Sequence, residues 1–129
     1  MKRLLLHIVL TMVMFMPMIV YGQSAKIKFD NTMHDFEAVP EEGGPVVHDF
    51  TFTNEGDAAL VVIDVNTNCG CTVADFPQAP IAPGKQGVIT ITFDPKGHPG
   101  EFAKEIIVKT NGKKKKSRLR IKGMVIPQQ

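Results

Sequence analysis

Short runs of alternating apolar and polar residues, separated by clusters of turn-forming residues, constrain this fold more than any other sequence feature. Successive side chains of a β-strand point to opposite faces, so such alternation is typical of a half-buried strand. One face of the run from 46 to 53 would carry Val46, His48, Phe50 and Phe52. Other candidate strands are Ile27–Phe29, Leu60–Val65, Val88–Phe93, Phe102–Thr110 and Ser117–Val125. Helical spacing is not seen over comparable lengths, so the sequence predicts an all-β chain.

Turn signals lie between these runs. They are the segments 41–45 (EEGGP), 54–57 (NEGD), 80–84 (PIAPG) and 94–100 (DPKGHPG). Asn111-Gly112 predicts a hairpin, and the lysines that follow indicate a connection longer than two residues. About seven short strands with such turns predict one antiparallel β-sandwich. An antibody-type domain would need a core Trp and two distant cysteines, and this chain has neither.

The first 22 residues have the pattern of a signal peptide. Lys2 and Arg3 precede the apolar stretch Leu4–Val20, and small residues before Gln23 predict cleavage there. A retained N-terminal anchor is the alternative, because about 17 apolar residues is the lower limit for a membrane span. We therefore expect a leader at 1–22, one domain at 23–129, and a periplasmic or extracellular protein without a membrane span in its mature form.

Charge is unevenly distributed along the expected mature chain. Residues 23–94 contain 3 cations and 11 anions, whereas residues 95–129 contain 10 cations and 2 anions. Over residues 23–129 the cations and the anions are equal in number, so the expected mature chain has a net charge of zero. This distribution predicts an acidic and a basic side of the fold.

A family resemblance rests on several of these segments together. FTFTNEGD (50–57), CGCT (69–72), IAPG (81–84) and TFDPKG (92–97) stand between the candidate strands. With these motifs, residues 27–125 resemble the bacterial domain-of-unknown-function family 1573. More distantly, the chain is similar to sandwiches of the major-sperm-protein, pilus-chaperone and cilia-associated type. The resemblance implies an exported Ig-like β-sandwich and no established activity.

Cys69 and Cys71, separated by one glycine, are the candidate site residues, and three interpretations stay open. An oxidising compartment favours a disulfide, although closing so short a loop removes only about 1.6 kcal/mol of unfolded-state entropy. Two thiolates could instead bind Cu(I) or another soft metal with a third ligand. Candidate third ligands are His34, His48, His98, Met33 and Met124. Thiol exchange is the third interpretation, although a thioredoxin-type motif has two intervening residues and opens a helix.

Catalysis finds little support in the expected mature chain. It contains two serines, Ser24 beside the cleavage point and Ser117 on a predicted strand, and neither lies in a nucleophile elbow. Glu41 and Glu42 fall in a glycine-rich turn, where solvated side chains are expected. We therefore predict a protein that is not an enzyme and has no cofactor, apart from the soft metal considered above.

A basic hairpin is the second candidate site. It comprises Lys113, Lys114, Lys115 and Lys116, with Arg118, Arg120 and Lys122 alternating along the next strand. Such a hairpin could meet an anionic surface. Lysines also protect edge strands from aggregation, and a solvated loop beside such a strand is the alternative. Nucleic acid is not expected as a partner outside the cytoplasm.

These features predict an exported interaction or assembly module without enzymatic activity. Its partner would be another envelope or secreted protein, which adds a strand to an open sheet edge or docks on the basic hairpin. The alternative function is a thiol or metal site at Cys69 and Cys71.

Overall fold

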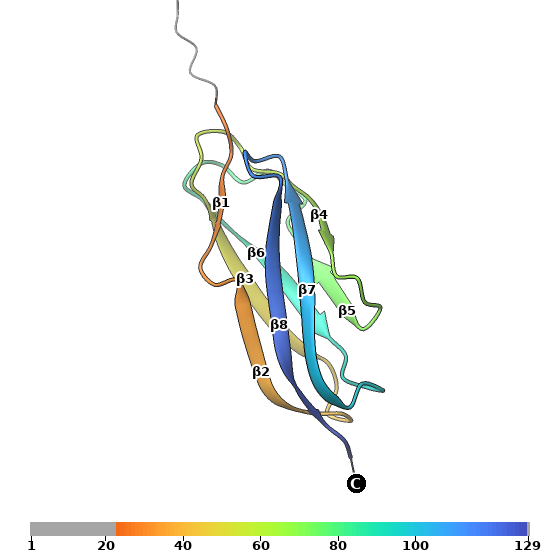
Figure 1. The fold of residues 1–129 in the computed structure, drawn as a ribbon. Helices are drawn as coiled ribbons and strands as arrows, with labels where there is room; N and C mark the ends of the chain where they lie inside the picture. The colour runs from red at the N-terminus through yellow and green to blue at the C-terminus, as the bar shows by residue number, and fades with distance from the viewer. Residues whose placement is uncertain (1–22, 129) are drawn as a thin grey trace, which may run out of the picture.

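Eight β-strands form two facing sheets in the computed structural model, which describes residues 23–128 (Figure 1). The strands are β1 (Ile27–Phe29), β2 (Met33–Pro40), β3 (Val46–Asn54), β4 (Val62–Asn66), β5 (Thr72–Asp75), β6 (Gln86–Phe93), β7 (Gly100–Thr110) and β8 (Lys116–Ile126). Sheet A has the order β1-β3-β6-β5, and sheet B has the order β2-β8-β7-β4. The predicted all-β sandwich is confirmed, whereas the predicted leader lies outside the described residues. Residues 23–128 include no helix long and apolar enough to cross a membrane.

The N-terminal part of the chain takes part in both sheets. β1 pairs antiparallel with β3, and β2 pairs in parallel with β8 in the opposite sheet. This parallel pair departs from the antiparallel arrangement expected from the sequence. β2 carries a bulge between Asp35 and Ala38, and Glu37 within it has a φ of 60°. A bulge shifts the alternation of side chains, which explains why the sequence pattern did not predict β2.

Fifteen buried apolar residues fill the space between the sheets. Phe50 and Phe52 are fully buried, as the alternation in β3 predicts. Phe93 of sheet A stacks on Phe102 of sheet B, with ring centroids 4.2 Å apart. Full burial of one such side chain contributes about 1.5–3 kcal/mol, so this interior is the main source of stability.

A single buried amide joins the strand ends near the start of the described chain. The Asn54 side chain, which is 0% exposed, accepts hydrogen bonds from the N–H groups of Gly56 and Lys26. Its Nδ2 donates to the carbonyl oxygens of Ala58 and Ile81, at 2.8 and 2.9 Å. All the hydrogen-bonding capacity of this amide is thereby used, so Asn54 holds the turn after β3 in place.

The predicted hairpin at Asn111 connects β7 to β8 through a loop longer than two residues, as the lysines after Gly112 indicate. The Asn111 side chain accepts from Val61 N–H at 2.8 Å and donates to Ala59 C=O at 3.1 Å. These bonds attach the hairpin to the segment before β4. That segment is less regular than predicted, because Leu60 forms only an isolated bridge with Ile81.

Candidate functional site

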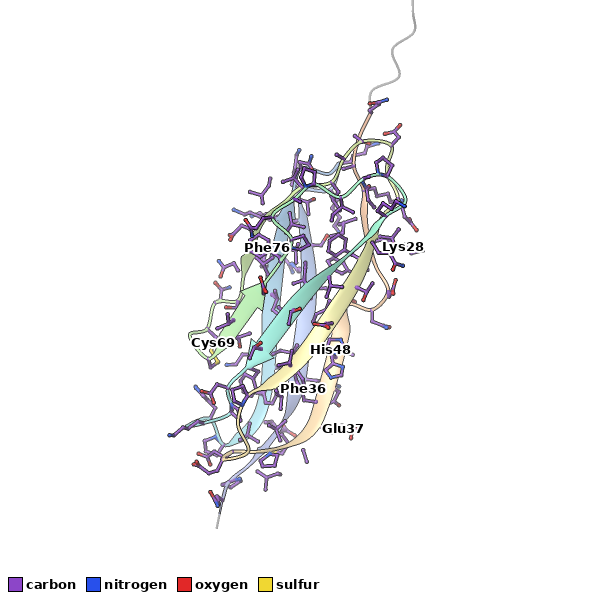
Figure 2. All side chains as sticks on the ribbon, turned by 180° about the vertical axis from the view of Figure 1, so that it is seen from behind. Lys28, Phe36, Glu37, His48, Cys69 and Phe76 are labelled. Atoms are coloured by element: carbon purple, nitrogen blue, oxygen red, sulfur yellow. A yellow bond between two sulfur atoms is a disulfide. The ribbon has the colours of Figure 1, made fainter. Side chains whose placement is uncertain are left out.

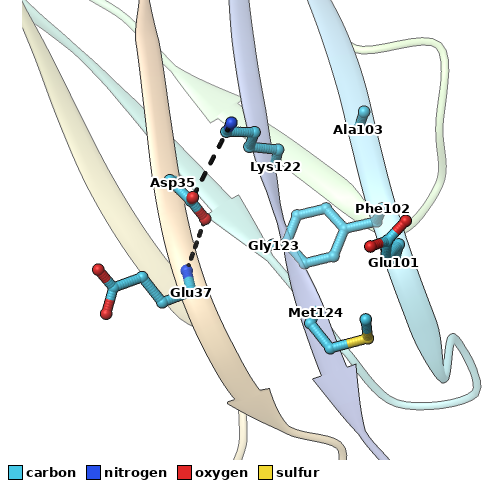
Figure 3. Close-up of a pocket in the computed structure, with 8 residues that line it drawn as sticks. All are labelled: Asp35, Glu37, Glu101, Phe102, Ala103, Lys122, Gly123 and Met124. Carbon is cyan, nitrogen blue, oxygen red and sulfur yellow. Dashed lines mark hydrogen bonds and ion pairs between the residues drawn. The ribbon is translucent and has the colours of Figure 1, made fainter.

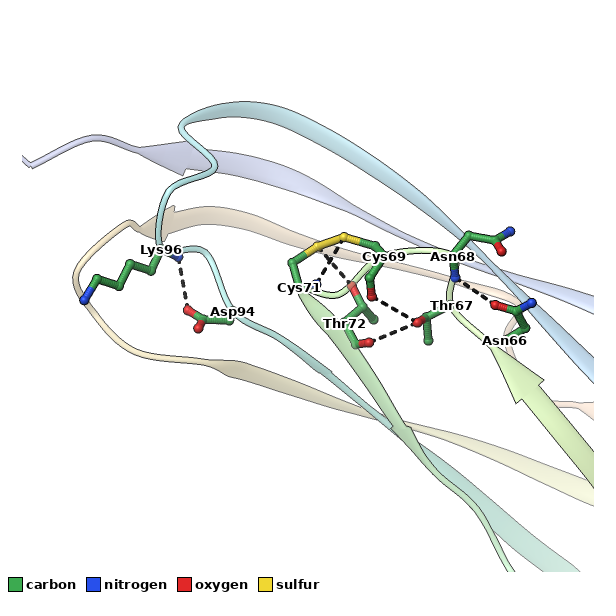
Figure 4. The surroundings of a disulfide bond; sticks show 8 residues. All are labelled: Asn66, Thr67, Asn68, Cys69, Cys71, Thr72, Asp94 and Lys96. Carbon is green, nitrogen blue, oxygen red and sulfur yellow. Dashed lines mark hydrogen bonds between the residues drawn. A yellow bond between two sulfur atoms is a disulfide. The ribbon is translucent and has the colours of Figure 1, made fainter.

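Cys69 and Cys71 form a disulfide in the loop between β4 and β5 (Figure 4). The two Cα atoms are 5.3 Å apart, and both residues are half-buried. A disulfide offers no thiolate. Metal binding or thiol exchange at this pair would therefore require reduction first.

Side-chain and main-chain hydrogen bonds hold this loop. Asn68 adopts a left-handed conformation, with a φ of 54°, and its N–H donates to Asn66 Oδ1 at 2.9 Å. Thr67 Oγ1 donates to the carbonyl oxygen of Thr72 at 3.0 Å, and Thr72 N–H donates to Cys69 C=O at 3.2 Å. Asn tolerates this left-handed conformation better than most residues.

The same bonds close one end of the β5 edge. Asp94 N–H donates to Cys71 C=O at 2.9 Å. The main-chain groups of Cys71 therefore point towards β6, and those of Thr72 point away from it. The main-chain groups of Thr72 would otherwise lie at an open sheet edge. Because Cys69 and Thr67 bond them, the disulfide loop caps the beginning of β5.

The two sulfur atoms differ in their surroundings. Cys71 N–H donates to Cys69 Sγ at 3.3 Å, and Cys71 Sγ lies 3.6 Å from Thr72 Oγ1. Each sulfur atom thus has one polar group beside it, a main-chain N–H at Cys69 and a hydroxyl at Cys71.

The candidate histidine ligands do not cluster with the cysteine pair, and the candidate ligands Met33 and Met124 are exposed on β2 and β8. Within residues 23–128, no group of three or more His, Cys, Asp and Glu side chains is arranged around a common point. His34 and His48 stack on each other, and the ring of His98 lies 6.5 Å from that of Phe93. The structure thus does not join these imidazoles to the cysteine pair.

A stacked histidine pair lies where β2 and β3 of opposite sheets approach each other (Figure 2). The rings of His34 and His48 are 3.6 Å apart and nearly parallel, and Phe36 and Phe50 contact them edge-on. Burial lowers the pKa of His48, His34 lowers it further, and Asp49 opposes both effects. His48 thus packs against His34 and Phe50.

The structure divides the predicted basic hairpin into two parts. Arg118 Nε lies 3.3 Å from Glu105, and Lys122 Nζ lies 4.0 Å from Asp35. Arg120 pairs in register with Glu105 on the same outer face of sheet B. The other part is the exposed tip Lys113–Lys116, which takes no part in the ion pairs found among residues 23–128.

A shallow groove of about 680 Å³ crosses the outer face of sheet B (Figure 3). Acidic side chains of β2 and β7 flank Lys122, and Phe102 fills the space beside Gly123. A Cβ atom at Gly123 would lie 2.8 Å from the Phe102 ring.

One half of β3 has no strand on its outer side in the described part of the chain. β1 pairs only with residues 52–54, and Asp30 N–H donates to Thr51 C=O at 3.0 Å. Main-chain groups alternate in direction along a strand, so those of Asp49 and Val47 point to this same side. Neither residue has a main-chain partner there among residues 23–128. The segment 46–50 is thus an open edge of sheet A, and Val47 is 58% exposed.

Other sheet edges are short or interrupted. β1 and β5 have three and four residues, and the disulfide loop caps β5. β4 contains an irregularity beside Ile63, and β2 contains a bulge and ends at Pro40. Bulges, short edges and prolines prevent unwanted strand pairing. The open edge of β3 lacks these features, which the sequence could not reveal because pairing partners were unknown.

Comparison with solved structures supports the fold. A Porphyromonas gingivalis W83 protein of unknown function superposes with a TM-score of 0.70 at 18% identity, covering 86% of this chain and 51% of that one. The PapD-like domain 7 of human CEP192 gives a TM-score of 0.62 at 15% identity, covering 89% and 95%. The YadV chaperone gives 0.52 at 17% identity, covering 80% and 52%.

At these identities the similarity concerns the fold alone, and the chain spans about half of the P. gingivalis protein. A search of curated proteins finds no match to the sequence. The family model described as "Protein of unknown function (DUF1573)" matches residues 27–125, nearly the whole described chain. The predicted resemblance is confirmed, and the chain belongs to the DUF1573 family.

Proposed function

We propose that this domain is an exported, non-enzymatic interaction module that receives an extended segment of another envelope or secreted protein at the open edge of β3. The single observation that carries the proposal is the row of unpaired main-chain groups at Val47 and Asp49. Such groups form a ready template for an added strand. The PapD-like fold of its structural neighbours is consistent with this role.

The surroundings of the open edge indicate what segment fits. Side chains of an added strand alternate between the outer face, beside Val47 and Asp49, and the inner side, towards His34 and Phe36. Asp49 is exposed, although Thr90 Oγ1 donates to it at 2.7 Å. The preferred segment therefore alternates apolar and polar residues, places its apolar side chains inward, and carries a cation opposite Asp49.

A proline at position 47 tests the proposal. The Val47 N–H faces the open edge, so Val47→Pro removes a donor there without breaking the bonds between β3 and β6. Ala74→Pro is the matched control, because the Ala74 N–H faces the free side of β5. Both variants and the parent are used to capture partners from a native envelope extract, with main-chain hydrogen exchange measured on the complexes.

We expect the parent and Ala74→Pro to retain the same partner, and Val47→Pro to lose it. In the parent complex, the Val47 and Asp49 amides should become protected from exchange. Retention of the partner by Val47→Pro would place the contact elsewhere on the domain. Failure of all three proteins to capture a partner under gentle conditions would contradict the interaction function itself.

A second candidate function is thiol exchange or soft-metal binding at Cys69 and Cys71. It is favoured by the Cys71 N–H, whose nitrogen lies 3.3 Å from Cys69 Sγ, because such a donor would stabilise a thiolate formed there by reduction. The test counts free thiols with and without reductant and measures Cu(I) binding to anaerobically purified protein. Two reducible thiols that bind Cu(I) tightly support this function. A pair that resists reduction and holds no metal contradicts it.

A further inference from the structure

Several turns meet at the end of the sandwich where the described chain begins (Figure 1). Asp57 N–H donates to Ser24 C=O at 3.0 Å, and Asn54 N–H donates to Lys85 C=O at 3.0 Å. Lys113 N–H donates to Ala25 C=O at 3.1 Å. These bonds gather four segments at one end, namely 24–28, 54–57, 84–85 and 111–116.

This end carries seven exposed lysines and two carboxylates, and it is called the basic end below. The lysines are Lys26, Lys28, Lys85, Lys113, Lys114, Lys115 and Lys116. Both carboxylates are engaged by neighbours, because Glu55 lies 3.5 Å from Lys28 Nζ and Asp57 accepts from Ser24 N–H at 2.7 Å. The excess positive charge therefore lies mainly on the four lysines of the hairpin tip.

The opposite end of the sandwich has the opposite sign. It contains the turns 41–45 and 94–99 and the start of β7, with the carboxylates Glu41, Glu42, Asp94 and Glu101 against Lys96. Residues 23–129 contain equal numbers of cations and carboxylates. The domain thus has no net charge, and it carries a charge separation along its long axis. Attraction to a charged surface would depend on orientation rather than on total charge.

The chain enters the domain at the basic end. Ala25, which bonds to Lys113, lies three residues after the predicted leader, and three residues span at most about 10 Å. This distance is similar to the screening length of about 8 Å at physiological salt. The preceding 22 residues include the apolar run Leu4–Val20, which is suited to a bilayer. As long as the predicted leader is attached, a chain that leaves a membrane at Gln23 would hold these lysines within reach of the lipid headgroups.

We propose that the basic end docks on the anionic phospholipid surface of the membrane through which the chain is exported. The acidic end then points away from the bilayer, and the open edge of β3 stays accessible along the side. Juxtamembrane lysines are attracted to anionic lipids by a screened electrostatic interaction. None of the large apolar side chains exposed among residues 23–128 belongs to the four segments of the basic end, so binding is electrostatic and decreases with salt.

Vesicle flotation with residues 23–129, which include all eight strands, tests the proposal. Phosphatidylcholine vesicles are compared with vesicles that also contain phosphatidylglycerol, at low and physiological salt. The test variant carries Lys113→Gln, Lys114→Gln and Lys115→Gln. The control carries Lys96→Gln, Arg120→Gln and Lys122→Gln, so both variants lose the same charge. Spin-labelled lipid then identifies the amides nearest the bilayer by NMR line broadening.

We expect binding only to the anionic vesicles, and a loss of about tenfold or more in the hairpin variant, with the control close to the parent. Broadening should affect residues 24–28, 54–57 and 111–116 and spare residues 41–45 and 94–99. Equal losses in the two variants, or broadening at the acidic end, would overturn the proposal. Binding of polyglutamate without binding of anionic vesicles would also overturn it, in favour of an acidic protein as the partner.

Discussion

Replacing Asn54 by alanine tests whether one buried amide holds the N-terminal end of the sandwich. The substitution removes bonds to the N–H groups of Lys26 and Gly56 and to the carbonyl groups of Ala58 and Ile81. Each hydrogen bond contributes about 1 kcal/mol net, and the 3.3 Å bond to Lys26 contributes less. The expected loss is about 3 kcal/mol, or about 15 °C in melting temperature.

Urea unfolding of the parent and variant, with the m-value compared, measures this loss. Asn111→Ala is the control, because the Asn111 side chain also bonds to Val61 and Ala59 but is exposed. Water can replace exposed bonds, so the control should lose about 1 kcal/mol or less. The reasoning is refuted if Asn54→Ala costs no more than Asn111→Ala.

Asn54→Asp extends the same test through pH. Asp keeps one side-chain oxygen as the acceptor and replaces the amide nitrogen, which donates two hydrogen bonds, by an oxygen that faces two carbonyl groups. Burial of the carboxylate in these surroundings raises its pKa. A carboxyl group whose pKa is higher in the folded than in the unfolded chain destabilises the fold at pH values above its unfolded-state pKa. The deficit relative to the parent should therefore shrink as pH falls, and a deficit independent of pH would contradict the assigned contacts.

Three further predictions concern packing, pH and the disulfide. Gly87→Ala should lower stability by about 1–3 kcal/mol in urea unfolding, because its Cβ would lie 2.4 Å from the Phe52 ring; an unchanged midpoint would contradict this packing. The lowered pKa of His48 means that the unfolded chain binds more protons near pH 6, so stability should fall as pH drops through this range. His48→Gln should reduce that slope, and an unaltered slope would assign it to other groups. Replacing both Cys69 and Cys71 by serine should cost at most about 1.6 kcal/mol, and a larger loss would show that the loop needs the bond for more than chain entropy.

Strands with a regular alternation of apolar and polar residues are recognisable in the sequence, because each sheet buries one of its two faces against the other sheet. Phe50 and Phe52 in β3 and Leu119 and Ile121 in β8 are examples, and all four are buried. The missed strands β2 and β5 lie at sheet edges. Their residues are selected less by the core than by bulges and capping, as at Glu37, so they carry a weaker periodic signal.

The candidate sites depend on contacts that a linear sequence does not contain. The lysine tip was evident from composition, whereas the pairing of Arg118 with Glu105 required the β7–β8 register. The motif around Cys69 was equally evident, but its role in capping β5 follows from the direction of main-chain groups. The open edge of β3 follows from the point at which β1 turns away.

The parallel pairing of β2 with β8 joins the first strand of sheet B to the last strand of the chain. β8 also lies between β2 and β7, so sheet B has no continuous centre until residues 116–126 are present. Contacts between such distant segments form late, because a long loop must close first. Sheet B therefore cannot be completed until its final strand, β8, is available.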